Sequence, residues 1–409
     1  MVFLDLVRVV AAAHVAGSAM SVSEPSAFAR DGWRERTRLT GDWLGTRSSI
    51  EDAGITFDAS LFIDWTANFK GGIRIGSGMQ HLCIASLTLD TDALFDHPGG
   101  TVYGEFQWLD GKQISRHFVG DVQAYSNIEE ERRAQLAEMW YEQRLLDDRL
   151  RMKIGKVDAN TEFAVAENAM EFLNSSMGFS PTVFLLPTYP DPAMSVNIFF
   201  QPLDSLILGL GVYDGSLQRG VRTGARGPRS VFNSRGACFL IGEVGLRWGN
   251  ERNASAWPGR LAIGAWHHTG RINRWTGGTQ SGTTGLYAVL DQTIWRAGSA
   301  QEDATVGLFM QYGYAEARVS EIEHHAGGGF AWTGIVPGRP EDVIGLGASW
   351  ARLSEQAGFV RGSETAIELF YQARLTPWLI VQPDLQLIRH PGGERGHALV
   401  GTLRFWLNF

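Results

Sequence analysis

The chain has 409 residues, including 49 Gly, 14 Trp and 22 Phe, and only 20% of its residues are charged. Its formal net charge of −8 and the lack of a Lys/Arg run argue against a nucleic-acid-binding protein. No apolar stretch of about 18 residues occurs, which excludes a helical membrane span but not membrane-spanning β-strands, because those are short and alternate.

The first residues predict a secretory signal peptide over residues 1–29. Arg8 precedes a short apolar run, and Ala27-Phe28-Ala29 offers a cleavage site of the A-x-A kind, although Asp5 and His14 are unusual in such a segment. Residues 30–54 contain a short amphipathic turn. We expect them to form a small periplasmic cap before the sheet begins.

From Gly54 onward, apolar and polar residues alternate, which is the pattern of β-strands with one apolar face. Phe106 and Trp108 share one face of a predicted strand, for example, whereas Glu105 and Gln107 share the other. About sixteen such segments occur, and they start near residues 55, 80, 101, 138, 149, 193, 205, 237, 259, 283, 302, 322, 342, 361, 379 and 397.

The connections between these segments differ in length. Short, turn-like connections such as 96–100 and 146–148 tend to alternate with longer ones such as 111–137 and 158–192. Short turns at one end and long loops at the other are typical of outer-membrane barrels. A soluble sandwich also alternates, but it would need polar outward faces, and here the apolar stripe recurs strand after strand. The sequence therefore predicts an all-β fold, a transmembrane antiparallel β-barrel of about 16 strands over residues 55–409.

The connection at residues 158–192 is too long for an ordinary turn and too apolar for a disordered linker. It follows a strict charged/apolar alternation from Arg149 to Ile154 and is rich in Asn, Ser, Pro and Phe. We expect it to fold back into the barrel and narrow the pore. Its aromatic residues would anchor it to the barrel wall: Phe163, Phe172, Phe179 and Phe184.

Over nearly all of residues 39–409, the chain also resembles a known family. The resemblance is carried by the order and spacing of short motifs: Gly41-Asp42-Trp43-Leu44-Gly45-Thr46-Arg47, Gly155-Lys156-Val157-Asp158-Ala159-Asn160, Phe172-Leu173-Asn174-Ser175-Ser176, Gly211-Val212-Tyr213-Asp214-Gly215 and Gly334-Ile335-Val336-Pro337-Gly338-Arg339-Pro340. These motifs are similar to those of the OprB family of carbohydrate-selective outer-membrane porins of Gram-negative bacteria. The resemblance implies a sixteen-stranded porin that admits glucose and related sugars by facilitated diffusion, and it implies a homotrimer. The chain departs from the family at Leu44, where the family usually carries glycine.

A sugar is neutral and edged with hydroxyl groups, so a selective pore needs hydrogen-bonding groups and aromatic surfaces in several weak sites. The alternation and the loop together predict these candidate substrate-pore residues: Glu105, Glu138, Trp140, Glu142, Arg144, Arg149, Arg151, Lys153, Asp158, Asn160, Glu162, Asn174, Glu368 and Arg374. Trp140 shares a predicted face with two carboxylates. It is either a stacking platform for sugar or part of the packing against the loop.

The basic residues Arg149, Arg151 and Lys153 leave the solute open. They suit a sugar acid or a quinate-like organic anion if they face the constriction. They suit a neutral sugar equally well if Glu138 and Glu142 pair with them across the sheet.

Other motifs do not indicate chemistry, and we predict no cofactor and no metal. The pairs His267-His268 and His324-His325 cannot each chelate one ion, because adjacent strand residues point to opposite faces. An outer-membrane enzyme with a Ser/His dyad is the less favoured alternative, since the sequence has no G-x-S-x-G motif and places no His convincingly near a Ser.

Outside the pore, the predicted partners are outer-membrane lipid and lipopolysaccharide. Aromatic rings on the outer face would act as interfacial anchors: Trp108, Trp248, Trp266, Trp350, Trp378 and Phe405. Five arginines cluster in one loop, where they either meet anionic lipopolysaccharide or are solvated: Arg219, Arg222, Arg226, Arg229 and Arg235.

Overall fold

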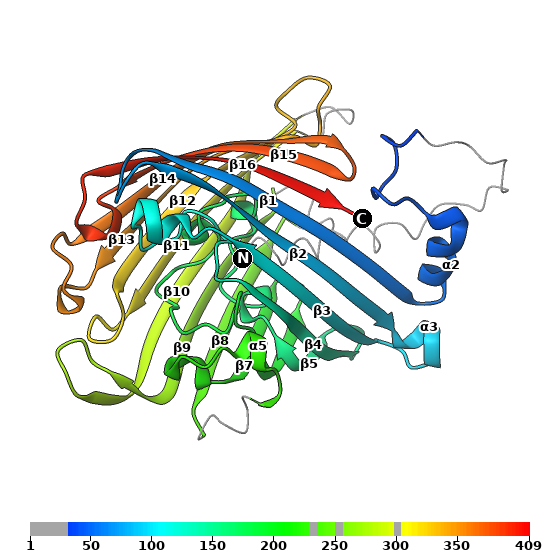
Figure 1. The fold of residues 1–409 in the computed structure, drawn as a ribbon. Coiled ribbons are helices and arrows are strands. Elements are labelled where there is room, and N and C mark those ends of the chain that lie inside the picture. Colours follow the sequence, from blue (N-terminus) through cyan, green and yellow to red (C-terminus); the bar gives the residue numbers. More distant parts are fainter. Residues whose placement is uncertain (1–31, 230–235, 250–256, 298–303) are drawn as a thin grey trace.

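The computed structural model describes residues 32–229, 236–249, 257–297 and 304–409, and the predicted signal peptide at residues 1–29 lies outside these ranges. Within them, sixteen strands form one closed barrel in which each strand pairs antiparallel with the next along the chain, and β1 closes on β16 (Figure 1). The fold predicted from the alternation is confirmed.

The strands are β1 (Ile55–Gly71), β2 (Gly76–Asp90), β3 (Gly100–Gly111), β4 (Arg133–Leu145), β5 (Leu150–Val157), β6 (Ala193–Leu203), β7 (Leu206–Asp214), β8 (Cys238–Trp248), β9 (Gly259–Asn273), β10 (Thr279–Arg296), β11 (Thr305–Ala315), β12 (Ile322–Thr333), β13 (Val343–Leu353), β14 (Ser363–Thr376), β15 (Leu379–Arg389) and β16 (His397–Asn408). The α-helices are short: α2 (Thr46–Asp52), α3 (Thr91–Phe95), α4 (Ser175–Gly178) and α5 (Thr223–Arg226). In the part of the chain that the structure describes, no helix is both long and apolar enough to cross a membrane.

Each strand turns alternate side chains to the lumen and to the outside. On β3, Phe106 and Trp108 are 46% and 43% exposed on the outer face, whereas Glu105 and Gln107 are buried on the lumen side. The same pattern of exposed apolar residues recurs on β7 and β13. Apolar side chains can remain this exposed where the surrounding solvent is lipid, so the barrel has the outer surface of a membrane protein.

Two of the predicted interfacial anchors are wrong. Trp266 on β9 is only 1% exposed and faces the lumen, where its ring contacts Phe184 of the long loop with centroids 5.6 Å apart. Trp378, in the turn before β15, is buried beside Trp33, and its indole N–H donates to the Trp33 carbonyl oxygen at 2.9 Å. Where a loop packs against the inner wall, both faces of a strand are apolar, so alternation alone does not tell inside from outside.

Residues 32–54 lie against the end of the barrel where the first strand starts and the last strand finishes (Figure 1). The backbone N–H of Leu39 donates to the Asn408 carbonyl oxygen at 2.8 Å. Arg38 forms an ion pair with Asp58 of β1 at 2.7 Å, and the guanidinium of buried Arg47 donates to the backbone oxygen of the C-terminal residue at 3.1 Å. This segment therefore joins both ends of the sheet.

Candidate pore constriction

The long connection between β5 and β6, residues 158–192, lies inside the barrel. Its middle reaches β14, where the backbone N–H groups of Leu173 and Asn174 donate to the Glu368 carboxylate at 2.5 and 3.0 Å. Because β5 and β14 lie on opposite sides of a cylinder of sixteen strands, the loop crosses the lumen and narrows it. We call residues 158–192 the pore loop.

Aromatic side chains hold the pore loop against the wall. Phe163 packs on Phe199 of β6 with ring centroids 5.3 Å apart, and Phe172 packs edge-on against Phe370 of β14 at 4.9 Å. Such pairs add to the free energy gained from apolar burial. The four aromatic residues predicted to anchor the loop all belong to this cluster or pack against it: Phe163, Phe172, Phe179 and Phe184.

Inward-facing glycines of the wall make room for the pore loop. A Cβ atom added at Gly209 or Gly211 of β7 would lie 3.0 Å from the Phe163 ring, and one added at Gly347 of β13 would lie 2.8 Å from the Phe172 ring. Any larger residue at these positions would push the loop away from the wall. The sequence patterns missed this role, because a glycine does not reveal which face of a strand it occupies.

Carboxylates on the wall accept hydrogen bonds from the backbone of the pore loop. Glu138 on β4 accepts from the N–H of Asp158 at 3.0 Å, and Glu243 on β8 accepts from the N–H of Ala164 at 2.9 Å. A buried carboxylate needs such donors to offset the loss of water. Of the predicted pore residues, Glu138 and Glu368 therefore hold the loop in place.

Three predicted residues of the pore loop are buried, each no more than 4% exposed. Asp158 accepts from the N–H of Asn160 at 2.9 Å, and the Asn160 side chain donates to the Phe163 carbonyl oxygen at 2.9 Å. The Asn174 side chain donates to Gln386 of β15 at 3.2 Å. These residues shape the loop and its attachment.

Four charged side chains form a cluster at the base of the pore loop. Arg151 donates to Glu142 at 2.8 Å and to the two oxygens of Glu162 at 3.0 and 2.6 Å. Lys153 Nζ lies 2.5 Å from Glu162 and 3.5 Å from Glu142. Two cations thus face two carboxylates, and we call this group the charge-balanced cluster. Glu142 lies opposite Lys153 across the sheet and pairs with it, as expected if the basic residues serve a neutral sugar. Glu138 was expected to pair in the same way, but it binds the backbone of the pore loop instead.

Trp140 faces the lumen beside this cluster. Lys153 Nζ lies 3.9 Å from the centroid of the indole, and the indole stacks on Tyr103 with centroids 4.8 Å apart. Tyr103 in turn donates to Glu105 at 2.7 Å, and Glu105 is only 4% exposed. Glu105 is therefore buried in the wall, whereas Trp140 packs against Tyr103 and Lys153 and stays partly exposed.

Water reaches this region at the guanidinium groups. The side chain of Arg144 is 51% exposed and that of Arg151 is 22% exposed, whereas Glu142, Lys153 and Glu162 are 7% exposed or less. Arg144 lies 3.2 Å from Glu142, so it is a third cation at the solvent-exposed edge of the charge-balanced cluster. A solute at the cluster would meet hydrogen-bond donors first, with the carboxylates set behind them.

Two predicted pore residues lie away from the constriction. Arg149 is in the turn before β5, where it donates to the Pro202 carbonyl oxygen at 3.0 Å. Arg374 lies near the end of β14, with its guanidinium 3.4 Å from Glu341. Both occupy the short-turn end of the barrel. The alternation predicts the face on which a side chain lies, but it does not predict its depth along the pore.

A second ionic network connects the pore loop to β8, β9 and β10. Arg247 donates to Glu167 of the loop at 2.6 Å, and Arg260 donates to Glu243 at 2.9 Å. Arg260 also lies 3.7 Å from both Glu167 and Asp291. The sequence analysis missed Arg260 and Asp291, although Arg260 alternates with small inward residues and could have been found by that pattern.

The connection at residues 112–132 also folds into the lumen. Asn127 accepts from Arg404 of β16 at 2.9 Å, and Arg404 forms a bidentate ion pair with buried Asp64 of β1 at 2.7 and 2.8 Å. At the other side of this segment, the N–H of Val122 donates to Glu364 of β14 at 3.0 Å. Two inward segments therefore occupy part of the lumen.

The arginine-rich loop is partly folded onto the barrel. Arg222 forms an ion pair with Glu131 at 2.5 Å, and the N–H of Gly224 in α5 donates to Asp191 of the pore loop at 3.1 Å. Arg222 is therefore engaged with another loop, and its side chain stays about half exposed. Arg235 lies outside the described residues.

The structure places one His beside one Ser, a pair that was not predicted from the sequence. His325 Nε2 lies 2.7 Å from Ser349 Oγ, and that hydroxyl donates to Gln123 at 2.5 Å. Both residues are 0% exposed, so a substrate has no access to the pair. Its role is to tie residues 112–132 to β12 and β13. Among the described residues, no group of three or more His, Cys, Asp or Glu side chains is placed to hold a metal ion.

The family model described as carbohydrate-selective porin, OprB family, matches residues 85–409. The chain belongs to this family. It is an outer-membrane porin through which carbohydrates pass by facilitated diffusion, and its family is a family of channels. The resemblance first indicated by the short motifs is confirmed.

Individual relatives agree with this assignment over nearly the whole chain. Porin B of Pseudomonas aeruginosa is 23% identical over 422 residues, which cover 90% of each chain. The high-pH structure of Pseudomonas putida OprB has a TM-score of 0.80 at 19% identity and covers 94% of this chain and 100% of that one. The low-pH structure of the same protein has a TM-score of 0.62 at 17% identity, with 92% and 99% covered.

Proposed function

We propose that the constriction favours neutral monosaccharides, with glucose as the representative solute. The observation that supports this proposal is the charge-balanced cluster, in which Arg151 and Lys153 face Glu142 and Glu162. An uncompensated pair of cations would attract anions over several ångströms. A balanced set acts on a solute mainly through hydrogen bonds and local dipoles, which orient hydroxyl groups without selecting one sign of charge.

Within this proposal, Arg144 and Arg151 are the groups that contact the sugar. A guanidinium has five N–H donors, and Arg151 directs three hydrogen bonds to carboxylates. The face of its guanidinium lies 4.0 Å from the centroid of the Phe199 ring, which fixes its orientation. A sugar that makes a few such hydrogen bonds binds weakly enough to leave, as conduction requires.

Single-channel conductance in planar bilayers tests the solute. We expect saturable block by glucose and weaker block by gluconate. Arg144→Gln removes an exposed donor that pairs with Glu142, so glucose block should weaken about threefold to tenfold, the effect of one lost hydrogen bond. Arg389 is an exposed arginine at the last position of β15. Arg389→Gln is therefore the matched control and should leave the block unchanged.

The alternative solute class is sugar acids or quinate-like organic anions. Block by gluconate without block by glucose would contradict the neutral-sugar proposal and support that alternative. Equal effects of Arg144→Gln and Arg389→Gln would contradict the role of Arg144 in contacting the sugar.

We also propose that residues 1–29 are removed as a signal peptide, that residues 30–54 form the periplasmic cap, and that the protein assembles as a homotrimer in contact with lipid and lipopolysaccharide. The family resemblance supports the trimer, and the apolar outer face supports the lipid contact. N-terminal sequencing of the mature protein and native mass spectrometry in detergent test these points. An uncleaved N-terminus or a monomer would contradict the corresponding statement.

A further inference from the structure

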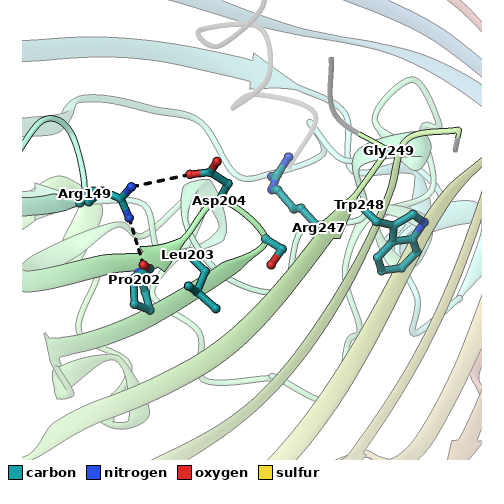
Figure 2. Close-up of a pocket in the computed structure, with 8 residues that line it drawn as sticks. Arg149, Pro202, Leu203, Asp204, Arg247, Trp248 and Gly249 are labelled. Carbon is teal, nitrogen blue, oxygen red and sulfur yellow. Dashed lines mark hydrogen bonds and ion pairs between the residues drawn. The ribbon is translucent and has the colours of Figure 1, made fainter. Parts of the chain in front are cut away.

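A hollow that lies apart from the charge-balanced cluster is found at the short-turn end of the barrel. It has a volume of about 440 Å³ and is lined by residues from three segments: Arg149, Pro202, Leu203, Asp204, Ser205, Arg247, Trp248 and Gly249. Figure 2 shows Arg149, Leu203, Asp204 and Arg247 among the residues that line it. A hollow of this volume falls within the usual range of small-molecule sites.

The hollow has the mixture of groups that a sugar needs. Arg149 and Arg247 supply N–H donors, and their side chains are 51% and 43% exposed. Asp204 supplies a carboxylate that accepts several hydrogen bonds at once, and Ser205 supplies a hydroxyl that both donates and accepts. Leu203 contributes an apolar surface for the flat side of a sugar ring.

The polar side chains of Arg149 and Asp204 are partly exposed at the hollow. Arg149 lies 3.9 Å from Asp204, which is beyond hydrogen-bond distance. The two side chains are both about half exposed, at 51% and 53%. A hydroxyl group that lies between them would accept from Arg149 and donate to Asp204. This arrangement matches a neutral polyol better than an anion, because an anion would meet the Asp204 carboxylate.

The hollow adjoins the constriction. Arg247 lines it and also donates to Glu167 of the pore loop at 2.6 Å. The hollow therefore borders the pore loop on the side of the short turns, which faces the periplasm in outer-membrane barrels. One of its residues, Arg149, is two residues from Arg151 of the charge-balanced cluster. Conduction through a selective pore is efficient when several weak sites follow one another.

We infer that this hollow is an exit subsite for neutral monosaccharides, which receives the sugar from the constriction before its release. The inference rests on the proposed function, because it takes the same class of solute. It adds a second binding place with its own lining residues. Of the predicted pore residues, Arg149 is the one that lines it, and Arg149 lies outside the constriction.

Sided sugar block of single channels tests the inference. Glucose is added either to the short-turn side or to the long-loop side, and its association rate is taken from the current noise. Arg149→Gln and Asp204→Asn should each lower the association rate from the short-turn side about threefold to tenfold, as expected for one lost hydrogen bond. The rate from the long-loop side should stay unchanged. Arg389→Gln and Asp96→Asn, which lie outside the hollow, are the matched controls.

The outcomes separate the two proposals. No glucose block from either side in the unmodified protein would contradict the proposed function and the subsite with it. Block from both sides that Arg149→Gln and Asp204→Asn leave unchanged would overturn the exit subsite alone. Stronger block by gluconate than by glucose from the short-turn side, lost in Arg149→Gln, would also overturn it, because the hollow would then take anions.

Discussion

Replacement of Glu162 by glutamine tests whether charge balance sets the selectivity of the pore. Glu162 accepts hydrogen bonds from Arg151 and Lys153 and is itself only 2% exposed in its side chain. Without its charge, Arg151 and Lys153 share Glu142 with Arg144, and the positive charge at the cluster increases by one unit. Glutamine keeps the size and one acceptor oxygen, so the pore loop should stay in place.

The expected magnitude follows from Coulomb's law. One unit charge at about 5 Å from a solute contributes about 0.8 kcal/mol in a medium with the dielectric constant of water. At about 1.4 kcal/mol for each factor of ten, this corresponds to about a fourfold change. The effective dielectric near a protein wall is lower than that of water, so fourfold is the lower end of the expected range.

The assay is the reversal potential in a potassium chloride gradient, together with block by gluconate. In Glu162→Gln, the affinity for gluconate should rise at least about fourfold. The chloride-to-potassium permeability ratio should rise about sixteenfold, because the same charge favours chloride and disfavours potassium, whereas glucose block should change little. Glu162→Asp keeps the charge and should keep the selectivity. Glu394→Gln removes an exposed carboxylate beside Arg395 and serves as the control. An unchanged permeability ratio in correctly folded Glu162→Gln would refute the reasoning.

Three further predictions concern the cap and the two inward segments. Leu44 has φ 61° and ψ 36°, a left-handed conformation, so Leu44→Gly should stabilise the cap by about 1 kcal/mol in urea unfolding followed by tryptophan fluorescence, and Leu44→Ala should not. Gly347→Leu should displace Phe172 and the pore loop and change the open-channel conductance, whereas Gly104→Leu, where an added Cβ meets nothing within 4 Å, should leave it unchanged. Burial raises the pKa of Glu129, in the connection between β3 and β4, to about 7. Its neutral form is favoured in the folded state, so the stability that it contributes is full below about pH 4.5 and is lost as the pH rises through about 7. Limited proteolysis of residues 112–132 should therefore speed up from pH 5 to pH 8 more in the unmodified protein than in Glu129→Gln, and equal pH responses would contradict this.

The barrel could be predicted because its signal is local. Phe106 and Glu105 are neighbours in the chain and point to opposite faces, so the sequence alone shows which side is apolar. The same rule failed for Trp266, because the inner wall of β9 is apolar where it receives the pore loop. The predictions of strand number and connection length are not affected by such exceptions, since they depend on many segments at once.

The site was harder to predict, because the residues that form it depend on their depth along the pore and on the path of the pore loop. Arg149 and Arg151 are two residues apart and alternate in the same sense, yet Arg151 binds Glu162 of the pore loop whereas Arg149 binds the turn at Pro202. Two residues of a strand span about 6.6 Å, enough to separate the constriction from the barrel mouth. The sequence does not show which depth the loop selects.

The structure also divides the predicted residues into those that position the loop and those that reach water, and the two classes differ in their expected effect. Glu368 is buried and accepts from the loop backbone, so Glu368→Gln should alter the shape of the constriction and change the block by glucose and by gluconate together. Arg144 is half exposed and holds no part of the loop backbone, so Arg144→Gln should act on the solute that it contacts. If Arg144→Gln also changed the block by glucose and the block by gluconate together, then Arg144, too, would act through the shape of the pore. Measurement of both solutes on both variants therefore separates contact from positioning, which activity toward glucose alone does not.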